Sequence, residues 1–371
     1  MLRTILHFAR KEFIQTFRDK RMLIPIFLSP VIMLIFFGYA VNIDVTHIKT
    51  GVVDHDRTAE SRALVEAFAR SGPFEIVVEE DEADALDPLF QDGTVEAALV
   101  IPSGYARDLD RGKRVPVQLI LDGTDANSAL IIQSYALGVI NDRSIRIMAR
   151  VFQRPPAGFI SPETRVWYNP ELRTSVFMVP GIISLILLIS TLILTAMAVT
   201  RERESGTLEQ ILVSPVRPLE LILGKTLPFM AIGLVDVIIV VAAGRLVFDI
   251  PFRGSLALLF FAAFLFILTT LSLGLLISTV SRTQPQALMT SFFIIMPAML
   301  LSGVFSPIET MPKAIQYFTL INPLRYIGRI VRGIMLKGSG IDLLWPELLA
   351  LLGISLILIT LSALRFKKYL E

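Results

Sequence analysis

Long apolar runs alternate with charged segments over most of the chain, and one long polar stretch interrupts them. A bilayer core about 30 Å thick is crossed by about 20 residues of helix at a rise of about 1.5 Å per residue. Backbone groups in lipid must be paired within the spanning segment, so each run predicts a helix. Only Asp236 and Glu347 bring a charge into these runs. The runs are 22–41, 176–200, 227–244, 255–281, 287–304 and 343–364.

The stretch 42–174 has a different pattern, with short runs rich in β-branched residues between polar helical segments. Such alternation of strands and helices is typical of a small α/β domain. Thr58 is placed to cap a helix, with Glu60 in its first turn. The predicted strands are 50–53, 74–78, 97–101 and 115–121, and the predicted helices are 58–70, 83–91 and a long one from 124 or 125 to 152.

Together these patterns predict an α-helical polytopic membrane protein with six transmembrane helices and an α/β extracytoplasmic domain inserted between the first and second spans. The expected parts are an interfacial helix at 1–21, the first span at 22–43, the inserted domain at 44–174 and the other spans at 175–371. The first helix has Leu2, Ile5, Leu6, Ala9, Phe13 and Phe17 on one side and Arg3, His7, Arg10 and Lys11 on the other. This amphipathic pattern suits an anionic membrane surface, although continuation of the first span is an alternative.

Composition supports a membrane protein. Hydrophobic residues are 53% of the 371, charged residues are only 18%, and the mean hydropathy is +0.65. The absence of cysteine excludes disulfides, thiolate metal sites and cysteine nucleophiles. The net charge of +2 gives no support for binding nucleic acid.

The distribution of charge predicts the orientation. Residues 42–174 contain 21 acidic and 14 basic residues, whereas basic residues gather before the first predicted span, after the second and at the end of the chain. The positive-inside rule therefore places both termini in the cytoplasm. A second basic cluster follows the fifth predicted span, and because its segment is half apolar we expect it to fold back into the membrane edge. Its members are Lys313, Arg325, Arg329, Arg332 and Lys337.

Two short stretches look like sites of chemistry but favour a structural interpretation. Asp54-His55-Asp56 offers metal ligands, yet no second ligand pair can be placed near it, so we favour a turn that ends a strand. Gly224-Lys225-Thr226 is similar to the end of a phosphate-binding loop, but Leu219 stands where its first glycine belongs. We expect no catalytic residue, no metal and no cofactor bound by this chain.

The cytoplasmic loop 201–215 carries the clearest functional pattern. Gly206 allows a sharp turn at the membrane face, and Thr207 can cap a short helix. Leu208, Ile211 and Leu212 would then form one apolar face. Such a helix is suited to docking a partner, and an ordinary interfacial turn is the alternative.

This loop resembles that of the permease subunits of type-2 ABC exporters, through the E-x-E-x-G-T-x-E-Q run at 202–210. A second match covers 302–312 and continues through 321–326 and 330–333. The resemblance extends over nearly the whole chain, and the large inserted domain is similar to that of the multidrug and small-molecule efflux subgroup.

The resemblance implies the roles of two residue sets. The ATPase-coupling set is Glu202, Glu204, Gly206, Thr207, Leu208, Glu209, Gln210, Ile211 and Leu212. The second set belongs to short outer helices that re-enter the membrane at 305–340, and it consists of Pro307, Glu309, Pro312, Asn322, Pro323, Arg325 and Tyr326.

The resemblance also implies the assembly. A half-transporter in the bacterial inner membrane would pair with a second permease subunit, either a copy or a paralogue, among membrane lipids. Separate ABC ATPase subunits would hold ATP and Mg, and a periplasmic adaptor is compatible with this arrangement. The transported substrate stays open among drugs, lipids and other small molecules.

Asp236 lies near the middle of its predicted span, where acids are costly and usually functional. We favour a place at a helix interface or in the lining of the pathway over a proton or cation site. An alternative function for the whole chain is a membrane-anchored sensor or mechanotransmission protein whose outer domain binds a ligand or partner. Six spans with a re-entrant segment favour the exporter, because a sensor needs fewer.

Overall fold

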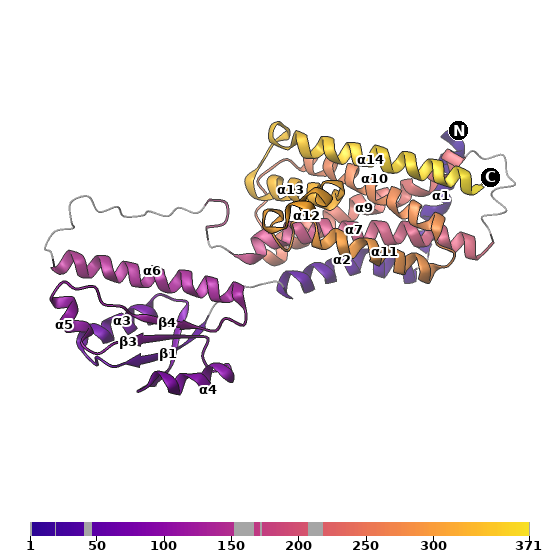
Figure 1. The fold of residues 1–371 in the computed structure, drawn as a ribbon. Coiled ribbons are helices and arrows are strands. Elements are labelled where there is room, and N and C mark those ends of the chain that lie inside the picture. Colours follow the sequence, from indigo (N-terminus) through magenta and orange to yellow (C-terminus); the bar gives the residue numbers. More distant parts are fainter. Residues whose placement is uncertain are drawn as a thin grey trace. The chain divides into compact units, whose positions relative to one another are not determined.

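The computed structural model describes residues 2–18, 20–40, 47–151, 167–170, 173–206 and 218–370. The chain divides into two compact units, which are taken separately below (Figure 1). The α/β unit is Ile43–Thr164, and the helical unit combines Met1–Asn42 with Arg165–Glu371.

The helical unit consists of long helices that follow the predicted apolar runs. They are α1 (Leu2–Arg18), α2 (Lys20–Ala40), α7 (Thr174–Glu204), α9 (Pro218–Phe248), α10 (Leu256–Val280), α11 (Gln284–Leu300) and α14 (Ile341–Leu370). Shorter helices lie between α11 and α14: η2 (Ile308–Thr310), α12 (Lys313–Phe318), η3 (Thr319–Ile321), α13 (Pro323–Arg332) and the π-helical η4 (Gly333–Lys337).

Among the described residues, four helices are long and apolar enough to cross a membrane. They belong to α7, α9, α10 and α14, and Ile26–Ala40 of α2 forms a shorter apolar helix. The 17 residues of α11 cover most of the fifth predicted run. A helical membrane protein with an α/β domain is therefore confirmed, while the number of six spans stays a prediction.

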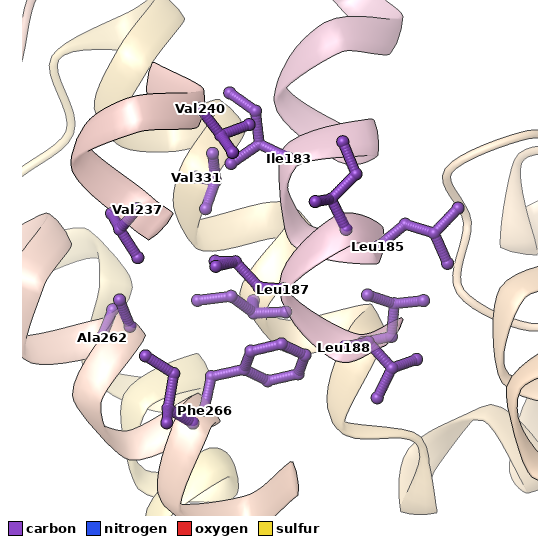
Figure 2. Close-up of a cluster of buried hydrophobic side chains, with 14 of the residues drawn as sticks. Ile183, Leu185, Leu187, Leu188, Val237, Val240, Ala262, Phe266 and Val331 are labelled. Carbon is purple, nitrogen blue, oxygen red and sulfur yellow. The ribbon is translucent and has the colours of Figure 1, made fainter. Parts of the chain in front are cut away.

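Helix α7 forms the centre of the helical unit. Its side chains Ile183, Leu185, Leu187 and Leu188 are buried among residues of α9, α10 and α13 (Figure 2). Nearly every position of its outer half is buried, from Val176 to Leu188. An all-round apolar helix of this kind belongs in a core, because it has no face to present to water.

Close contact between backbones joins α7 to α10. A Cβ added at Gly274 of α10 would lie 2.9 Å from the carbonyl oxygen of Leu192 and 2.8 Å from the Cβ of Thr195. Small residues of this kind let membrane helices approach each other closely. The same seam has a hydrogen bond of 2.6 Å between the hydroxyls of Thr191 and Thr270, both of which are buried.

The α/β unit has one four-stranded sheet with the order β2-β1-β3-β4. The strands are β1 (Ile48–Asp54), β2 (Phe74–Glu80), β3 (Ala97–Ile101) and β4 (Gln118–Leu121). Strand β1 is parallel to β2 and β3, and β4 pairs antiparallel with β3. The helices are α3 (Ala59–Arg70), η1 (Ala83–Ala85), α4 (Leu86–Gln91), α5 (Tyr105–Asp110) and α6 (Ala126–Val151).

Each face of this sheet has its own core. Leu64 and Phe68 of α3, Tyr105 of α5, and Ile132 and Ala136 of α6 pack against one face. Leu86 of α4 packs with side chains of β1 and β3 on the other face. Helices on both faces explain why β3 is buried at all five positions, as expected of a central strand.

The predicted elements of this unit are confirmed with three corrections. The strand expected from residue 115 begins only at Gln118. The helix α5 was not predicted, because a helix of six residues is too short to show a period and Gly104 precedes it in the left-handed region with φ 78°. The segment predicted as one helix at 83–91 starts as a 3-10 turn before α4.

The Asp54-His55-Asp56 stretch forms a turn at the end of β1. The carboxylate of Asp54 accepts hydrogen bonds from the backbone N–H of Asp56 (3.0 Å) and from the hydroxyl of Ser61 (2.6 Å). Thr58 caps α3 as predicted and forms a capping box with Ser61. Burial raises the pKa of Asp56, but hydrogen bonds from the Thr58 hydroxyl and the backbone N–H of Ala106 outweigh it and leave that pKa below its ordinary value.

Candidate coupling loop and re-entrant segment

The E-x-E-x-G-T-x-E-Q motif begins inside helix α7, and the chain leaves this helix through a tight turn. The helix continues to Glu204, and the N–H of Gly206 bonds to the carbonyl oxygen of Arg203 at 3.1 Å. Gly206 has φ 69°, so the predicted turn at this glycine is confirmed. Six members of the coupling set lie outside the described residues: Thr207, Leu208, Glu209, Gln210, Ile211 and Leu212.

Glu202 and Glu204, two acids of this motif, have partners within the chain that the sequence did not reveal. Glu202 forms an ion pair with Lys11 of α1, with 3.6 Å between Oε1 and Nζ. Glu204 accepts a hydrogen bond of 2.8 Å from the backbone N–H of Gln284, the first residue of α11, and another from its side-chain amide. The two acids therefore connect α7 to α1 and to α11.

Gly224 has a packing role that replaces the phosphate-binding interpretation. A Cβ at this position of α9 would lie 2.5 Å from the Cβ of Phe8 and 3.3 Å from the carbonyl oxygen of Ile5. Glycine is therefore needed here for the approach of α1. Ile5 is buried, whereas Leu6, Phe13 and Ile14 of α1 are exposed.

Asp236 is completely buried in α9, where its span packs against α7 and α10. Both carboxylate oxygens are buried, and the hydroxyl of Ser190 on α7 interacts with this carboxylate. One turn earlier on α9, a Cβ at Gly233 would lie 3.0 Å from Thr191 of α7 and 3.1 Å from Ile267 of α10, which is tighter than ordinary van der Waals contact. The structure thus places Asp236 in a helix interface.

The segment that follows α11 is a chain of short helices. Pro307 and Pro312 directly precede η2 and α12. Asn322 caps α13 by accepting a hydrogen bond from the N–H of Leu324 (3.1 Å), and its amide donates to the carbonyl oxygen of Ala298 in α11 (2.7 Å). Pro323 then occupies the first position of α13, where its missing N–H costs nothing.

The other residues of the re-entrant set form hydrogen bonds and an ion pair between the short helices. The hydroxyl of Tyr326 donates to the carbonyl oxygen of Leu320 at 2.8 Å, and Arg325 donates to the hydroxyl of Thr319. Glu309 forms an ion pair of 3.6 Å with Arg329, and both side chains are largely exposed. The predicted residues are thus brought together in one segment, with Asn322 linking it to α11.

Arg332 is the functional candidate whose role the sequence did not reveal. Its guanidinium donates to the carbonyl oxygens of Gly303 (3.1 Å), Val304 (3.3 Å) and Phe177 (3.3 Å), and lies 4.2 Å from the centre of the Phe177 ring. One side chain of α13 therefore holds the turn after α11 against the first turn of α7. The available signal was an arginine within the apolar positions 330–334.

These features define a helical membrane protein with several apolar membrane-length helices and an α/β domain. A profile of the ABC-2 family transporter proteins matches residues 20–364. The chain belongs to the ABC-2 family of transporter proteins, so the expected resemblance is confirmed. It is a permease subunit located in the inner membrane, and the ATPase activity resides in partner subunits.

Three relatives from Escherichia coli K12 illustrate the similarity. The probable multidrug ABC transporter permease YbhR is 35% identical over 348 residues, which is 93% of each chain. The probable multidrug ABC transporter permease YbhS is 29% identical over 97% of this chain and 96% of its own. The inner membrane transport permease YhhJ is 29% identical over 99% of this chain and 98% of its own.

Proposed function

We propose that this chain is the membrane-spanning half of an ATP-driven exporter that moves drug-like, lipid-like or other small molecules outward. The family match over residues 20–364 carries this proposal. Two of the relatives are named probable multidrug permeases, which supports a drug-like substrate. The sensor alternative is less favoured, because the similarity to permeases covers the membrane helices as well as the α/β unit.

The proposed topology has six spans, both termini in the cytoplasm and residues 44–174 outside. Four long apolar helices support it, together with α2 and α11 at the first and fifth predicted positions. Basic residues at both ends of the chain favour a cytoplasmic location of the termini. The segment 305–340 is proposed to re-enter from the outer leaflet, with Arg332 holding it to the start of α7.

Loop 201–215 is proposed to be the coupling helix that seats on an ATPase subunit. The turn at Gly206 supports this, because it ends α7 and redirects the chain. Since Glu202 and Glu204 have partners in α1 and α11, we assign contact with the ATPase to the residues from Thr207 to Leu212. Nucleotide and Mg would be held by the ATPase, and none by this chain.

The proposed assembly contains a second permease subunit and two ATPase subunits. Large apolar side chains exposed along α11, among them Met289 and Phe293, support a surface covered by lipid or by that second subunit. A periplasmic adaptor would add to this assembly on the outer side. Asp236, buried between helices, is proposed to act at the interface of α9 with its neighbours and not as a ligand site.

Reconstitution tests the proposal. Proteoliposomes containing the chain and its co-purifying ABC ATPase should transport ethidium in an ATP-dependent manner, whereas the chain alone should not. Replacing Glu209 and Leu212 with alanine should abolish stimulation of the ATPase by the permease. ATP-independent transport by the isolated chain would contradict the exporter, and full stimulation in the double variant would contradict the coupling role of this loop.

A further inference from the structure

The cytoplasmic end of α7 is attached to the turn between α10 and α11 at two adjacent residues. Arg203 donates from Nη1 to the carbonyl oxygen of Ser281 at 2.9 Å. Glu204 accepts from both the backbone N–H and the side-chain amide of Gln284. We call these four residues the latch.

We propose that the latch makes the start of α11 follow the end of α7, so that α11 receives the movement of the coupling loop. This inference rests on the proposed exporter function and assigns a positioning role to Glu204. It also divides the E-x-E-x-G-T motif, whose first part joins helices of this chain and whose later part contacts the ATPase.

The latch lies at the end of α7 that is joined to the loop, so a displacement of the loop acts first on this end of the helix. Helix α7 is continuous to Glu204, and the turn at Gly206 begins two residues later. Glu204, which is bonded to α11, therefore lies close to the point at which a displacement of the loop enters α7. Because a regular helix transmits displacement along its axis, the end of α7 and the start of α11 would move together.

The N-terminus of α11 favours binding of the Glu204 carboxylate. Gln284 is the first residue of that helix, and Thr283 caps it by accepting from the N–H of Gln286. The positive end of the helix dipole and the unpaired N–H groups of the first turn favour a carboxylate there. Arg201 adds a longer hydrogen bond of 3.4 Å to the side-chain oxygen of Gln284.

Helix α11 depends on such a contact because many of its side chains are not covered by other helices of the unit. Its side chains Met289 and Phe293 are 75% and 83% exposed, and within the described residues it packs chiefly against α7 and less against α10. A helix held mainly by α7 can follow α7 when α7 moves. The latch fixes the cytoplasmic end of this pair.

The natural absence of cysteine makes a direct test practical. The substitutions Met289→Cys on α11 and Leu364→Cys on α14 introduce two exposed positions for spin labels. The labelled permease is assembled with its ATPase subunits in nanodiscs, and the distance distribution is measured without nucleotide and after trapping with ADP and vanadate. With the latch intact, trapping should shift this distribution.

Three variants test whether the shift depends on the latch. Glu204→Ala should reduce the shifted fraction by about twofold to fivefold, the range expected for an exposed carboxylate at a helix N-terminus. Gln284→Ala should have a smaller effect, since the backbone N–H remains. The exchange Glu204→Gln with Gln284→Glu restores an amide–carboxylate pair and should restore the shift.

Glu66→Ala is the matched control, because it removes an exposed carboxylate that pairs with Arg70 in the α/β unit. The ATPase activity of the complex should be retained in all variants, which separates lost transmission from lost assembly. A full shift in Glu204→Ala, or no recovery in the exchange variant, would overturn the latch. Absence of a shift and of ATPase stimulation with the latch intact would instead contradict the proposed coupling to an ATPase.

Discussion

Arg332 should determine the stability of the re-entrant segment, and its neighbour Arg329 provides a matched control. Both arginines lie on α13, one turn apart. Arg332 donates to three backbone carbonyl oxygens and stacks on Phe177, whereas Arg329 forms a long ion pair with the exposed side chain of Glu309. The comparison of Arg332→Gln with Arg329→Gln therefore changes one feature, the environment of the guanidinium.

The expected difference follows from these contacts. Hydrogen bonds from a charged donor contribute about 1.5–3 kcal/mol each, and a cation–π contact about 0.5–2 kcal/mol. Because contacts of one side chain are not additive, we expect a total loss of about 3–5 kcal/mol for Arg332→Gln. Arg329→Gln should cost less than about 1 kcal/mol, as is usual for an exposed ion pair. Arg332→Lys should be intermediate, because a single ammonium cannot reproduce the planar fork.

The assay is the fraction of monodisperse protein that remains in detergent after heating. At about 2–4 °C per kcal/mol, Arg332→Gln should lower the midpoint by roughly 10 °C and Arg329→Gln by a few degrees at most. Proteolysis near residues 303–312 should become faster only in the Arg332 variants. Equal midpoints for the two glutamine variants would refute the reasoning.

Three further predictions concern other parts of the chain. Thr191→Val and Thr270→Val should each cost about 1 kcal/mol in heat stability, and the double variant less than the sum, because both substitutions remove the same hydrogen bond between the helices. Gly206→Ala places a Cβ at φ 69° at a cost of about 1 kcal/mol and should lower ATP-dependent ethidium transport, whereas Gly353→Ala, which has open space, should not. Since the folded pKa of Asp56 lies below the ordinary 3.8, its contribution to stability is present above that pH and is lost as the pH falls through the folded pKa. Hydrogen exchange in α3, compared between about pH 7 and about pH 3, should therefore change less in Asp56→Asn than in the natural chain.

Local signals predicted the elements of this protein well. The apolar runs are visible without tertiary information, because lipid requires one continuous helix for each span. Thr58 could be placed as a cap because a cap is formed within four residues of sequence. The start of β4 at Gln118 was misplaced, since the preceding residues have strand-like composition but no partner in the sheet.

The contacts that define the candidate sites could not be read from the sequence. Glu204 meets Gln284 across 80 positions, and Arg332 reaches Phe177 across 155. No periodicity encodes such pairs, because they depend on how helices pack. Gly224 shows the same limit, since Leu219 excludes a phosphate-binding loop but nothing in the sequence shows that this glycine admits α1.

The glycine seam between α7 and α10 restricts where this permease can bend. The carbonyl of Leu192 lies so close to Gly274 that only a residue without a side chain fits there. If α10 slid along α7, a larger residue of α10 would take the place of Gly274 and clash with the backbone of α7. The two helices must therefore travel as a single body through any cycle of inward and outward opening. The joints that permit such a cycle have to lie at the borders of this body, for example in the short connection between α9 and α10.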